Sequence, residues 1–333
     1  MTELFVSFIL AFCVGLLLIP AVFFVVDKAK AKQTILKYVT AHKNKQGTRT
    51  LGGLIFVVSS CIVAPFFFTG EARLAGVCVA VYLSFALLGF LDDFIKIRTH
   101  NNMGLKPYQK IIGQVGISVL IAIFVYNSSL IGTSIYLPWS FIEVDIGWGV
   151  IPLTIFVLLA MSNSANLTDG LDGLAGGVSA VCVMVFCVII SILCLNLQNS
   201  GVALNIVSEY KNLTILGACV VGGILAFLCV NANPAKIFMG DTGSLALGGF
   251  LGAMATFTGL QLILPIVCIW FVVSAVSVII QVAYFKLTKK RVFLMAPLHH
   301  HFEKKGMNEN KIVAIYIITT IIFGALSILL CLL

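Results

Sequence analysis

Apolar runs of about 20 residues recur along this chain, and they restrict its fold more than any other feature. A helical run of roughly 20 residues crosses the hydrocarbon core of a bilayer. Ten such runs can be drawn, approximately Leu4 to Val26, Leu51 to Phe68, Leu74 to Leu91, Ile111 to Ile131, Val150 to Asn166, Leu174 to Leu195, Leu213 to Val230, Ser244 to Thr258, Leu260 to Phe285 and Ile312 to Leu332. Only 10% of the 333 residues are charged, whereas soluble domains carry about a quarter. The sequence therefore predicts an all-α, polytopic integral membrane protein with about ten transmembrane helices, folded as a single transmembrane domain over residues 1-333.

The basic residues between these runs predict the orientation of the chain. Short cytoplasmic loops of membrane proteins carry an excess of Lys and Arg. If the N-terminus lies outside, nineteen Lys and Arg fall in inner loops, and only Arg73 and Lys211 fall in outer loops. Both termini are therefore expected to be periplasmic. Leu4 to Val26 is expected to remain as a span, because no basic region precedes it and it is longer than the core of a signal peptide.

The net charge of +8 is concentrated on this inner face. Such a charge attracts anionic lipids of the bilayer and anionic soluble substrates. No nucleic acid is expected as a partner, because that function would require a basic soluble domain.

Five carboxylates fall at the inner ends of the apolar runs, in three different loops: Asp92, Asp93, Asp169, Asp172 and Asp241. Charged groups beside a membrane span are costly to place, and they normally bind an ion or a substrate. Their occurrence on one membrane face predicts a metal-dependent site there. The alternative is that each carboxylate pairs with a nearby lysine.

Asp241 stands between Gly240 and Thr242, directly before an apolar run. A carboxylate on a tight turn at a helix start suits a hard cation, and an N-cap aspartate is the alternative. Adjacent Asp92 and Asp93 would point in different directions on a helix, so we do not expect them to hold one ion together. One of the two would serve as a base and the other would be structural.

The segment NSANLTDGLDGLAGG, residues 163–177, carries Asn166, Asp169 and Asp172 at three-residue steps. On a helical turn these side chains would form one polar stripe. The glycines between them let a phosphate or another backbone come close.

Two further inner loops carry candidate binding residues. Lys45 and Arg49 lie just before the second apolar run, where they could hold a phosphate, although an ordinary basic cytoplasmic loop is the alternative. The last inner loop contains His299, His300 and His301, which cannot all face one tetrahedral zinc site, and no cysteine is near them. We expect these histidines to stack on or hydrogen-bond to an anionic, aromatic ligand.

Six stretches of the chain carry a family resemblance: GTRTLGG, FLDDFIK, GLKPYQK, NLTDGLDGLA, NPAKIFMGDTGSLALGG and APLHHHFEKKG. They resemble the motifs of the polyprenyl-phosphate N-acetylhexosamine-1-phosphate transferases, and the HHHFE stretch resembles the mark of the muramoyl-pentapeptide branch. The chain departs from that pattern at Arg49 and Leu51, where the family usually has Pro and Met, and at Met307-Asn308, where it usually has Trp-Pro. These departures affect the expected loop shape rather than the chemistry.

The resemblance implies a transferase of the bacterial inner (cytoplasmic) membrane with Mg²⁺ as its cofactor. Such an enzyme transfers phospho-MurNAc-pentapeptide from UDP-MurNAc-pentapeptide to undecaprenyl phosphate, which forms lipid I and releases UMP during peptidoglycan synthesis. The resemblance also implies an active site on the cytoplasmic face and a homodimer.

By resemblance to the family, the positions of the motifs imply roles for individual residues of this chain. Asp241 would ligate Mg²⁺, and Asp92 and Asp93 would join it as catalytic residues. The expected substrate-binding residues are Lys45, Lys110, Asn166, Asp169, Asp172, Phe238, His299, His300 and His301. Lys45 and Lys110 would contact phosphates, and Phe238 would lie near the uracil.

The chemistry requires such residues, because a lipid phosphate that attacks a pyrophosphate brings two anions together. A cation must neutralise the charge, lysines must orient the groups, and a carboxylate can take the acceptor's proton. By resemblance, that base is Asp92. A two-step route through an aspartyl-phosphate is the competing mechanism.

Two other functions are alternatives. A sibling transferase that uses UDP-GlcNAc would share the aspartates and differ in the last inner loop. A transporter for phosphorylated substrates would more naturally place its ionisable groups near mid-membrane in broken helices.

Overall fold

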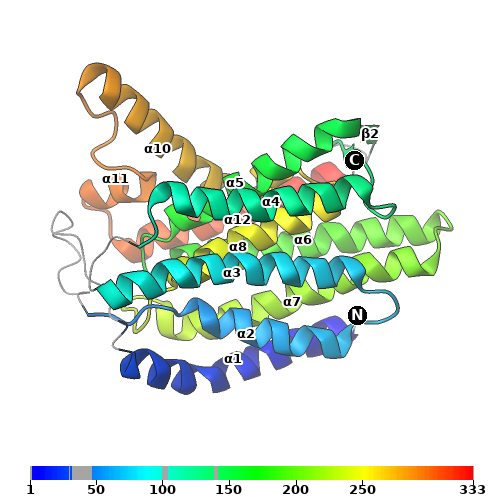
Figure 1. The fold of residues 1–333 in the computed structure, drawn as a ribbon, viewed down its shortest axis with the longest axis horizontal. Coiled ribbons are helices and arrows are strands. Elements are labelled where there is room, and N and C mark those ends of the chain that lie inside the picture. Colours follow the sequence, from blue (N-terminus) through cyan, green and yellow to red (C-terminus); the bar gives the residue numbers. More distant parts are fainter. Residues whose placement is uncertain (1, 30, 32–46, 100–103, 139–141, 333) are drawn as a thin grey trace.

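The computed structural model describes the chain except for residues 1, 30, 32–46, 100–103, 139–141 and 333. The described chain is mostly helical (Figure 1). Its α-helices are α1 (Thr2–Lys28), α2 (Gly53–Val63), α3 (Arg73–Thr99), α4 (Pro107–Asn127), α5 (Val150–Thr168), α6 (Leu174–Asn199), α7 (Leu204–Asn231), α8 (Gly240–Phe257), α9 (Leu264–Val267), α10 (Ile269–Thr288), α11 (Leu298–Lys304) and α12 (Glu309–Leu332). Two 3-10 helices, η2 (Ala64–Phe67) and η3 (Gly147–Gly149), and two strands, β1 (Ser134–Tyr136) and β2 (Glu143–Asp145), complete the described elements.

Each of the ten apolar runs contains a helix in the structure. Eight helices of the described chain are long and apolar enough to cross a membrane. α2 with η2 is shorter, and α8 is rich in glycine, so neither is among the eight. The ninth run is divided, because α9 ends at Val267 and α10 begins at Ile269. The protein is a multi-pass helical membrane protein, as the sequence predicts.

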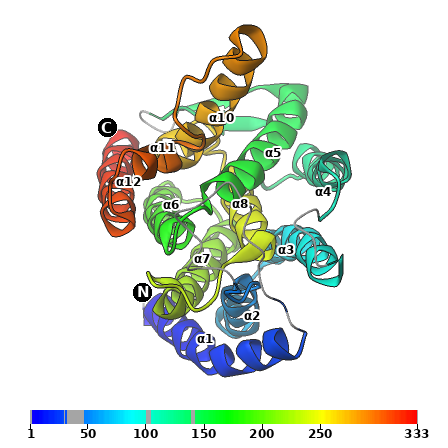
Figure 2. The same ribbon diagram turned by 90° about the vertical axis from the view of Figure 1, so that its left-hand side faces the viewer.

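Helix α8 lies in the middle of the bundle and packs against α3, α5, α2 and α6 (Figure 2). All of its residues from Thr242 to Phe257 are buried. Gly248 makes this position possible, because a Cβ atom there would overlap the backbone of Met161 in α5. Small residues are the usual means by which membrane helices approach closely.

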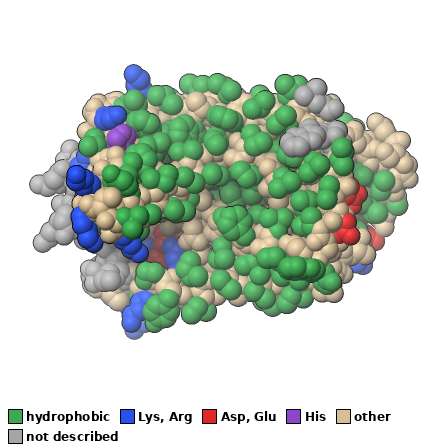
Figure 3. All heavy atoms as spheres, turned by 90° about the horizontal axis from the view of Figure 1, so that it is seen from above, with side chains coloured by type: hydrophobic (Ala, Val, Ile, Leu, Met, Phe, Trp, Pro, Cys, Tyr) green, Lys and Arg blue, Asp and Glu red, His purple; other side chains and the backbone are tan. Residues whose placement is uncertain are grey.

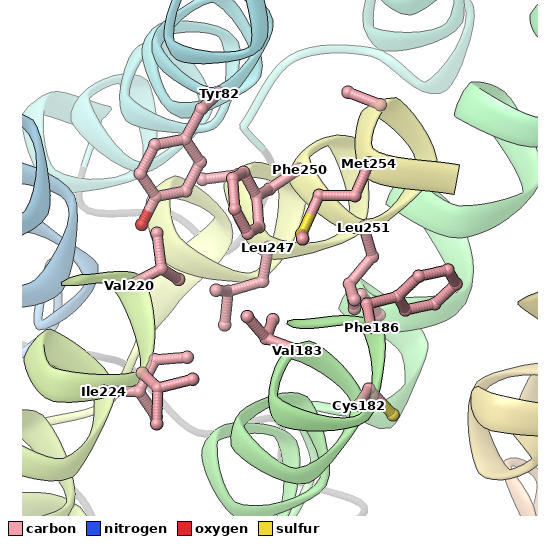
Figure 4. Close-up of a cluster of buried hydrophobic side chains, with 14 of the residues drawn as sticks. Tyr82, Cys182, Val183, Phe186, Val220, Ile224, Leu247, Phe250, Leu251 and Met254 are labelled. Carbon is pink, nitrogen blue, oxygen red and sulfur yellow. The ribbon is translucent and has the colours of Figure 1, made fainter. Parts of the chain in front are cut away.

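The core around α8 is filled by large apolar side chains (Figure 4). Tyr82 of α3 packs on Phe250 of α8, with 5.2 Å between the ring centroids. Val183 of α6 and Val220 of α7 complete the same cluster (Figure 4). This packing fixes the start of α8 relative to the ends of the surrounding helices.

A short hairpin departs from the all-α prediction. Strands β1 and β2 are antiparallel, with Ser134 opposite Asp145. The Tyr136 N–H donates to the Gly259 carbonyl at 2.8 Å, which connects the hairpin to the end of α8. The prediction missed this sheet because its three-residue strands lie in the connection between two apolar runs.

Charged side chains gather at opposite ends of the bundle (Figure 3). One end, here named the basic end, carries α11 and most of the visible Lys and Arg; the other, the acidic end, carries the hairpin and both termini (Figures 1 and 3). A broad band of hydrophobic side chains separates the two ends (Figure 3). The chain is therefore polarised along its helix axes, as expected for a membrane protein with a one-sided charge.

Candidate active site

Three carboxylates meet at the basic end of the bundle. Asp92 and Asp93 belong to the C-terminal part of α3, and Asp241 belongs to the first turn of α8. Each contributes an oxygen atom, and these oxygens all lie within 4.8 Å of one another. The two helices come this close because Gly89 has no side chain, and a Cβ atom there would overlap the Asp241 carbonyl group. Among the described residues, this is the group of His, Cys, Asp and Glu side chains that could hold a metal ion.

Asp92 and Asp93 both lie beside Asp241, although they are adjacent on one helix. Asp93 accepts hydrogen bonds from the backbone N–H groups of Asp241 (3.1 Å) and Thr242 (2.9 Å), and from Thr242 Oγ1 (2.8 Å). Asp92 Oδ1 accepts the Leu105 N–H at 2.8 Å, just before α4. We expected the two carboxylates to point in different directions, but an oxygen of each lies within 4.8 Å of the other, because the start of α8 lies across both side chains.

Asp93, rather than Asp241, satisfies the first N–H groups of α8. The residue before α8, Met239, makes no side-chain cap. Free N–H groups at a helix start need an acceptor and favour a negative charge. The N-cap alternative for Asp241 is therefore wrong, and the Asp241 carboxylate is available for other partners.

The capping role of Asp93 leads to a stability prediction. Asp93→Asn should lower the free energy of unfolding by about 1–3 kcal/mol, because an amide cannot accept from all three donors and loses the charge. Thr242→Val removes only one donor, so it should cost less, about 1 kcal/mol. Thermal melting of both purified variants beside the wild type measures the difference. Equal melting temperatures for Asp93→Asn and the wild type would exclude the capping role.

Two lysines lie among the carboxylates. Lys96 Nζ is 2.5 Å from Asp92 Oδ2, 3.7 Å from Asp93 Oδ1 and 2.9 Å from Asp241 Oδ2. Lys110 Nζ is 2.8 Å from Asp241 Oδ2. Carboxylate–lysine contacts thus occur, but Asp92, Asp93 and Asp241 share the Lys96 ammonium. The three carboxylates do not each pair with a separate lysine. Lys96 was not among the predicted site residues, although its spacing of four and three residues from the two aspartates on one helix is a signal for such contacts.

The predicted stripe of Asn166, Asp169 and Asp172 does not exist. Helix α5 ends at Thr168, and Asp169 has φ −77° and ψ 60°, which is not helical. A tight turn follows and ends at Gly173, whose φ of 76° suits glycine. The three side chains therefore do not share one helix face.

Asn166 and Asp172 consequently have different partners. Asn166 Nδ2 donates to Asp241 Oδ1 at 2.7 Å and to Ser244 Oγ at 2.9 Å, so it belongs to the carboxylate cluster. Asp172 is buried, and its Oδ2 accepts the Ala235 N–H at 3.0 Å in the loop between α7 and α8. This contact joins the turn at residues 169–173 to the loop that leads into Asp241.

Asp169 is half-buried at the end of α5. Its withdrawal from bulk water and the nearby charges of Asp241, Asp93 and Asp172 raise its pKa to about 8. A neutral carboxyl group can donate a hydrogen bond through its O–H, so Asp169 could bind an anionic oxygen near neutral pH.

The three histidines of α11 make three different contacts. The buried His299 ring lies against Gly170, where a Cβ atom would overlap its Nε2. His300 Nδ1 is 2.9 Å from Glu303 Oε2, and His301 Nδ1 accepts the Leu294 N–H at 3.1 Å. His299 therefore lies at the turn that carries Asp169, whereas His300 and His301 contact residues between α10 and α12.

The remaining candidates are Phe238, in the loop before α8, and Arg49 and Lys45, in the segment before α2. The Phe238 N–H donates to the Arg49 carbonyl at 2.8 Å, which sets Phe238 just before Asp241. The Arg49 guanidinium donates two hydrogen bonds of 2.8 Å to Asp27 of α1, so in this structure it is directed to α1. Lys45 lies outside the described residues.

Comparisons with known proteins show the family of this chain. The model of glycosyl transferase family 4 matches residues 74–259. The phospho-N-acetylmuramoyl-pentapeptide-transferase of Clostridioides difficile is 39% identical over 331 residues, which cover 98% of each chain. The enzyme of the same name from Acetivibrio thermocellus is 40% identical over 329 residues, which cover 98% of this chain and 92% of that relative. This chain belongs to the phospho-N-acetylmuramoyl-pentapeptide-transferase family.

The family resemblance seen in the sequence motifs is thereby confirmed. The range matched by glycosyl transferase family 4 contains the three clustered carboxylates and both lysines. The last inner loop with its histidines lies outside that range but inside the length shared with the phospho-N-acetylmuramoyl-pentapeptide-transferases, because those alignments cover 98% of the chain. A third relative of the same name, from Halalkalibacterium halodurans, is 37% identical over 330 residues, which cover 98% of this chain and 96% of that relative.

Proposed function

We propose that this protein transfers phospho-MurNAc-pentapeptide from UDP-MurNAc-pentapeptide to undecaprenyl phosphate, forming lipid I and releasing UMP in peptidoglycan synthesis. The observation that carries the proposal is the identity of 39–40% over 98% of the chain to enzymes named phospho-N-acetylmuramoyl-pentapeptide-transferase. The carboxylate and lysine cluster at one end of the bundle supplies the groups that such a transfer needs.

The cluster fits a Mg²⁺ ion, with Asp241 as the principal ligand and Asp92 and Asp93 beside it. The fit is supported by Lys96, because a position at which one ammonium contacts three carboxylates favours a cation. Carboxylate oxygens are also the ligands that Mg²⁺ prefers. When bound, the ion would neutralise the negative charge of the pyrophosphate.

The side chains around the cluster take the remaining tasks. Lys110 holds the donor phosphates, since its ammonium is at the edge of the cluster and partly exposed. Asp92 takes the proton of the acceptor phosphate, so that the phosphate oxygen can attack the donor pyrophosphate and UMP leaves. In the competing two-step route an aspartate first forms an aspartyl-phosphate.

The donor is bound by the loops that surround the cluster. We assign the nucleotide to Phe238 and Asp172, the sugar phosphate to Asn166 and Asp169, and a second phosphate contact to Lys45. His299, His300 and His301 delimit the donor site on the side of α11. Figure 3 shows a recess near the basic end with acidic and basic side chains inside it, which supports an open site for an anionic ligand.

The same proposal includes the orientation of the protein. We place ten spans in the bacterial inner membrane, within one domain of residues 1-333. The basic end faces the cytoplasm and both termini face the periplasm, because cytoplasmic loops hold the excess of Lys and Arg. The soluble UDP-sugar donor would reach the site from the cytoplasm.

Labelling from one side of the membrane tests this orientation. Cys13 and Cys229 are exposed and would first be replaced. In right-side-out vesicles, an impermeant maleimide should then label Glu143→Cys at the acidic end and leave Lys304→Cys unlabelled. The reverse pattern would contradict the assigned orientation.

Release of UMP from defined substrates tests the reaction itself. Purified protein with undecaprenyl phosphate and Mg²⁺ should release UMP from UDP-MurNAc-pentapeptide and not from UDP-GlcNAc. Turnover of UDP-GlcNAc would favour the sibling transferase. Uptake of a phosphorylated solute without UMP release would favour a transporter, a function that the position of the carboxylates at one end of the bundle does not support.

A further inference from the structure

Glu309, the first residue of α12, joins two loops of the candidate active site. Its Oε1 accepts the backbone N–H of Asp172 at 2.7 Å, and its Oε2 accepts Asn233 Nδ2 at 2.7 Å. Asp172 and Glu309 are 137 positions apart in the sequence. Hydrogen bonds to an ionised acceptor are about twice as strong as neutral ones, so these contacts can hold separate loops together.

The two joined loops contain proposed donor-binding residues. The turn at residues 169–173 contains Asp169 and Asp172, and the loop at residues 232–239 contains Phe238 and leads into α8. Asp172 strengthens the same connection, because its carboxylate accepts the Ala235 N–H of that loop at 3.0 Å. Glu309 and Asp172 thus form two bridges between the same pair of loops.

The start of α12 is itself held close to the site. Helix α11, with His299, packs against α12. His299 lies against Gly170 on the turn at residues 169–173, and Glu309 binds the same turn through Asp172. The last inner loop therefore contacts this turn through both α11 and α12.

We propose that Glu309 is a positioning residue for the nucleotide-sugar donor. It holds the Asp172 turn and the Asn233 loop at the separation at which both can contact one donor molecule. This inference rests on the proposed function. It adds that the affinity for the donor depends on Glu309, a residue that need not contact the donor itself. A site held in its binding geometry before the ligand arrives loses less entropy when the ligand binds. Only a carboxylate presents an acceptor oxygen to both loops, since glutamine has one oxygen and its NH₂ group would face the second donor.

Separate kinetics for the two substrates test the proposal. In Glu309→Gln, we expect the KM for UDP-MurNAc-pentapeptide to rise about tenfold, the effect of one strong hydrogen bond, while the KM for undecaprenyl phosphate stays unchanged. Glu309→Asp keeps the charge on a shorter side chain and should recover part of the donor affinity. Glu71→Gln is the matched control, because Glu71 lies at the acidic end in an exposed pair with Arg73.

Asn233→Ala is a second test of the same contact. It remains informative even if the Glu309→Gln protein does not fold. The Asn233 side chain is exposed, and the substitution removes the partner of Oε2 only. Its effect on the donor KM should be smaller than that of Glu309→Gln. The double variant should not exceed Glu309→Gln, because residues that act through one contact are not additive.

The outcomes separate this inference from the proposed function. If the wild type turns over and Glu309→Gln leaves the donor KM unchanged, or raises both KM values equally, the positioning role is overturned while the function stands. If the wild type uses UDP-GlcNAc, the proposed substrate is wrong, and the same comparison is made with that donor. If the wild type binds no nucleotide-sugar by calorimetry, both proposals are overturned.

Discussion

Asp241→Asn should reduce kcat for UMP release by about 10³ or more, since charge neutralisation by a bound cation is worth several kcal/mol in the transition state. Asp241 is the carboxylate that binds both lysines and Asn166. Asparagine would remove the negative charge and direct an amide N–H₂ group toward one of these donors. The variant should remain folded, because Asp93 rather than Asp241 caps α8.

A titration of Mg²⁺ at saturating substrates measures this effect, and thermal melting tests whether the variant is folded. Asp145→Asn makes the same chemical change on the exposed hairpin at the acidic end, so it should retain the wild-type rate. A folded Asp241→Asn protein with a near-normal rate and an unchanged Mg²⁺ requirement would show that Asp241 is not the principal ligand.

His299→Ala should reduce kcat/KM for UDP-MurNAc-pentapeptide by about 10², the cost expected when catalytic or binding groups shift by roughly 1 Å. The buried His299 ring fills the space against Gly170, so its removal frees the turn that carries Asp169. Gly170→Ala disturbs the same contact from the other side, because the new Cβ atom would overlap His299 Nε2. Both variants should therefore impair the same step.

Specific activity per folded molecule must be measured, because loss of a buried ring also lowers stability. Leu193→Ala, a buried position in α6, is the control that should lower the melting temperature without lowering activity per folded molecule. If His299→Ala behaves like Leu193→Ala, the histidine is structural only. Metal analysis adds an independent check, since stoichiometric zinc lost on substitution would indicate a metal site at the histidines.

The sequence alone was sufficient to predict the helical membrane fold. Apolar runs of span length predict helices because, in hydrocarbon, a single chain segment can satisfy its backbone hydrogen bonds only by forming a helix. The hairpin was missed because its three-residue strands carry no comparable signal. The motifs also placed Asp92, Asp93 and Asp241 at inner ends of the apolar runs, and residues at the same end of antiparallel helices can meet.

The roles within that cluster were decided only by the tertiary structure. The contacts of α3 with the start of α8 join residues 145 to 149 positions apart, and they require the close approach at Gly89. That approach makes Asp93 the cap of α8 and places Lys96 among three carboxylates. Helix periodicity could not predict either role, because both depend on which side chains a second helix brings into reach.

The turn after α5 is a second place where the sequence pattern was insufficient and the tertiary structure was needed. Three-residue spacing predicted one stripe, but the chain leaves the helix after Thr168, and Asp172 binds the loop before α8 instead. Glu309 carried no signal at all, since its two partners come from loops far from it in the sequence. The sequence by itself was sufficient to predict a multi-pass helical fold with its charges gathered at the ends of the apolar segments, because burial of apolar surface and the cost of charge in lipid act on each segment separately. Only the tertiary structure decided which carboxylates share the Lys96 ammonium and which hold loops in place, because those contacts exist only when separate helices pack together.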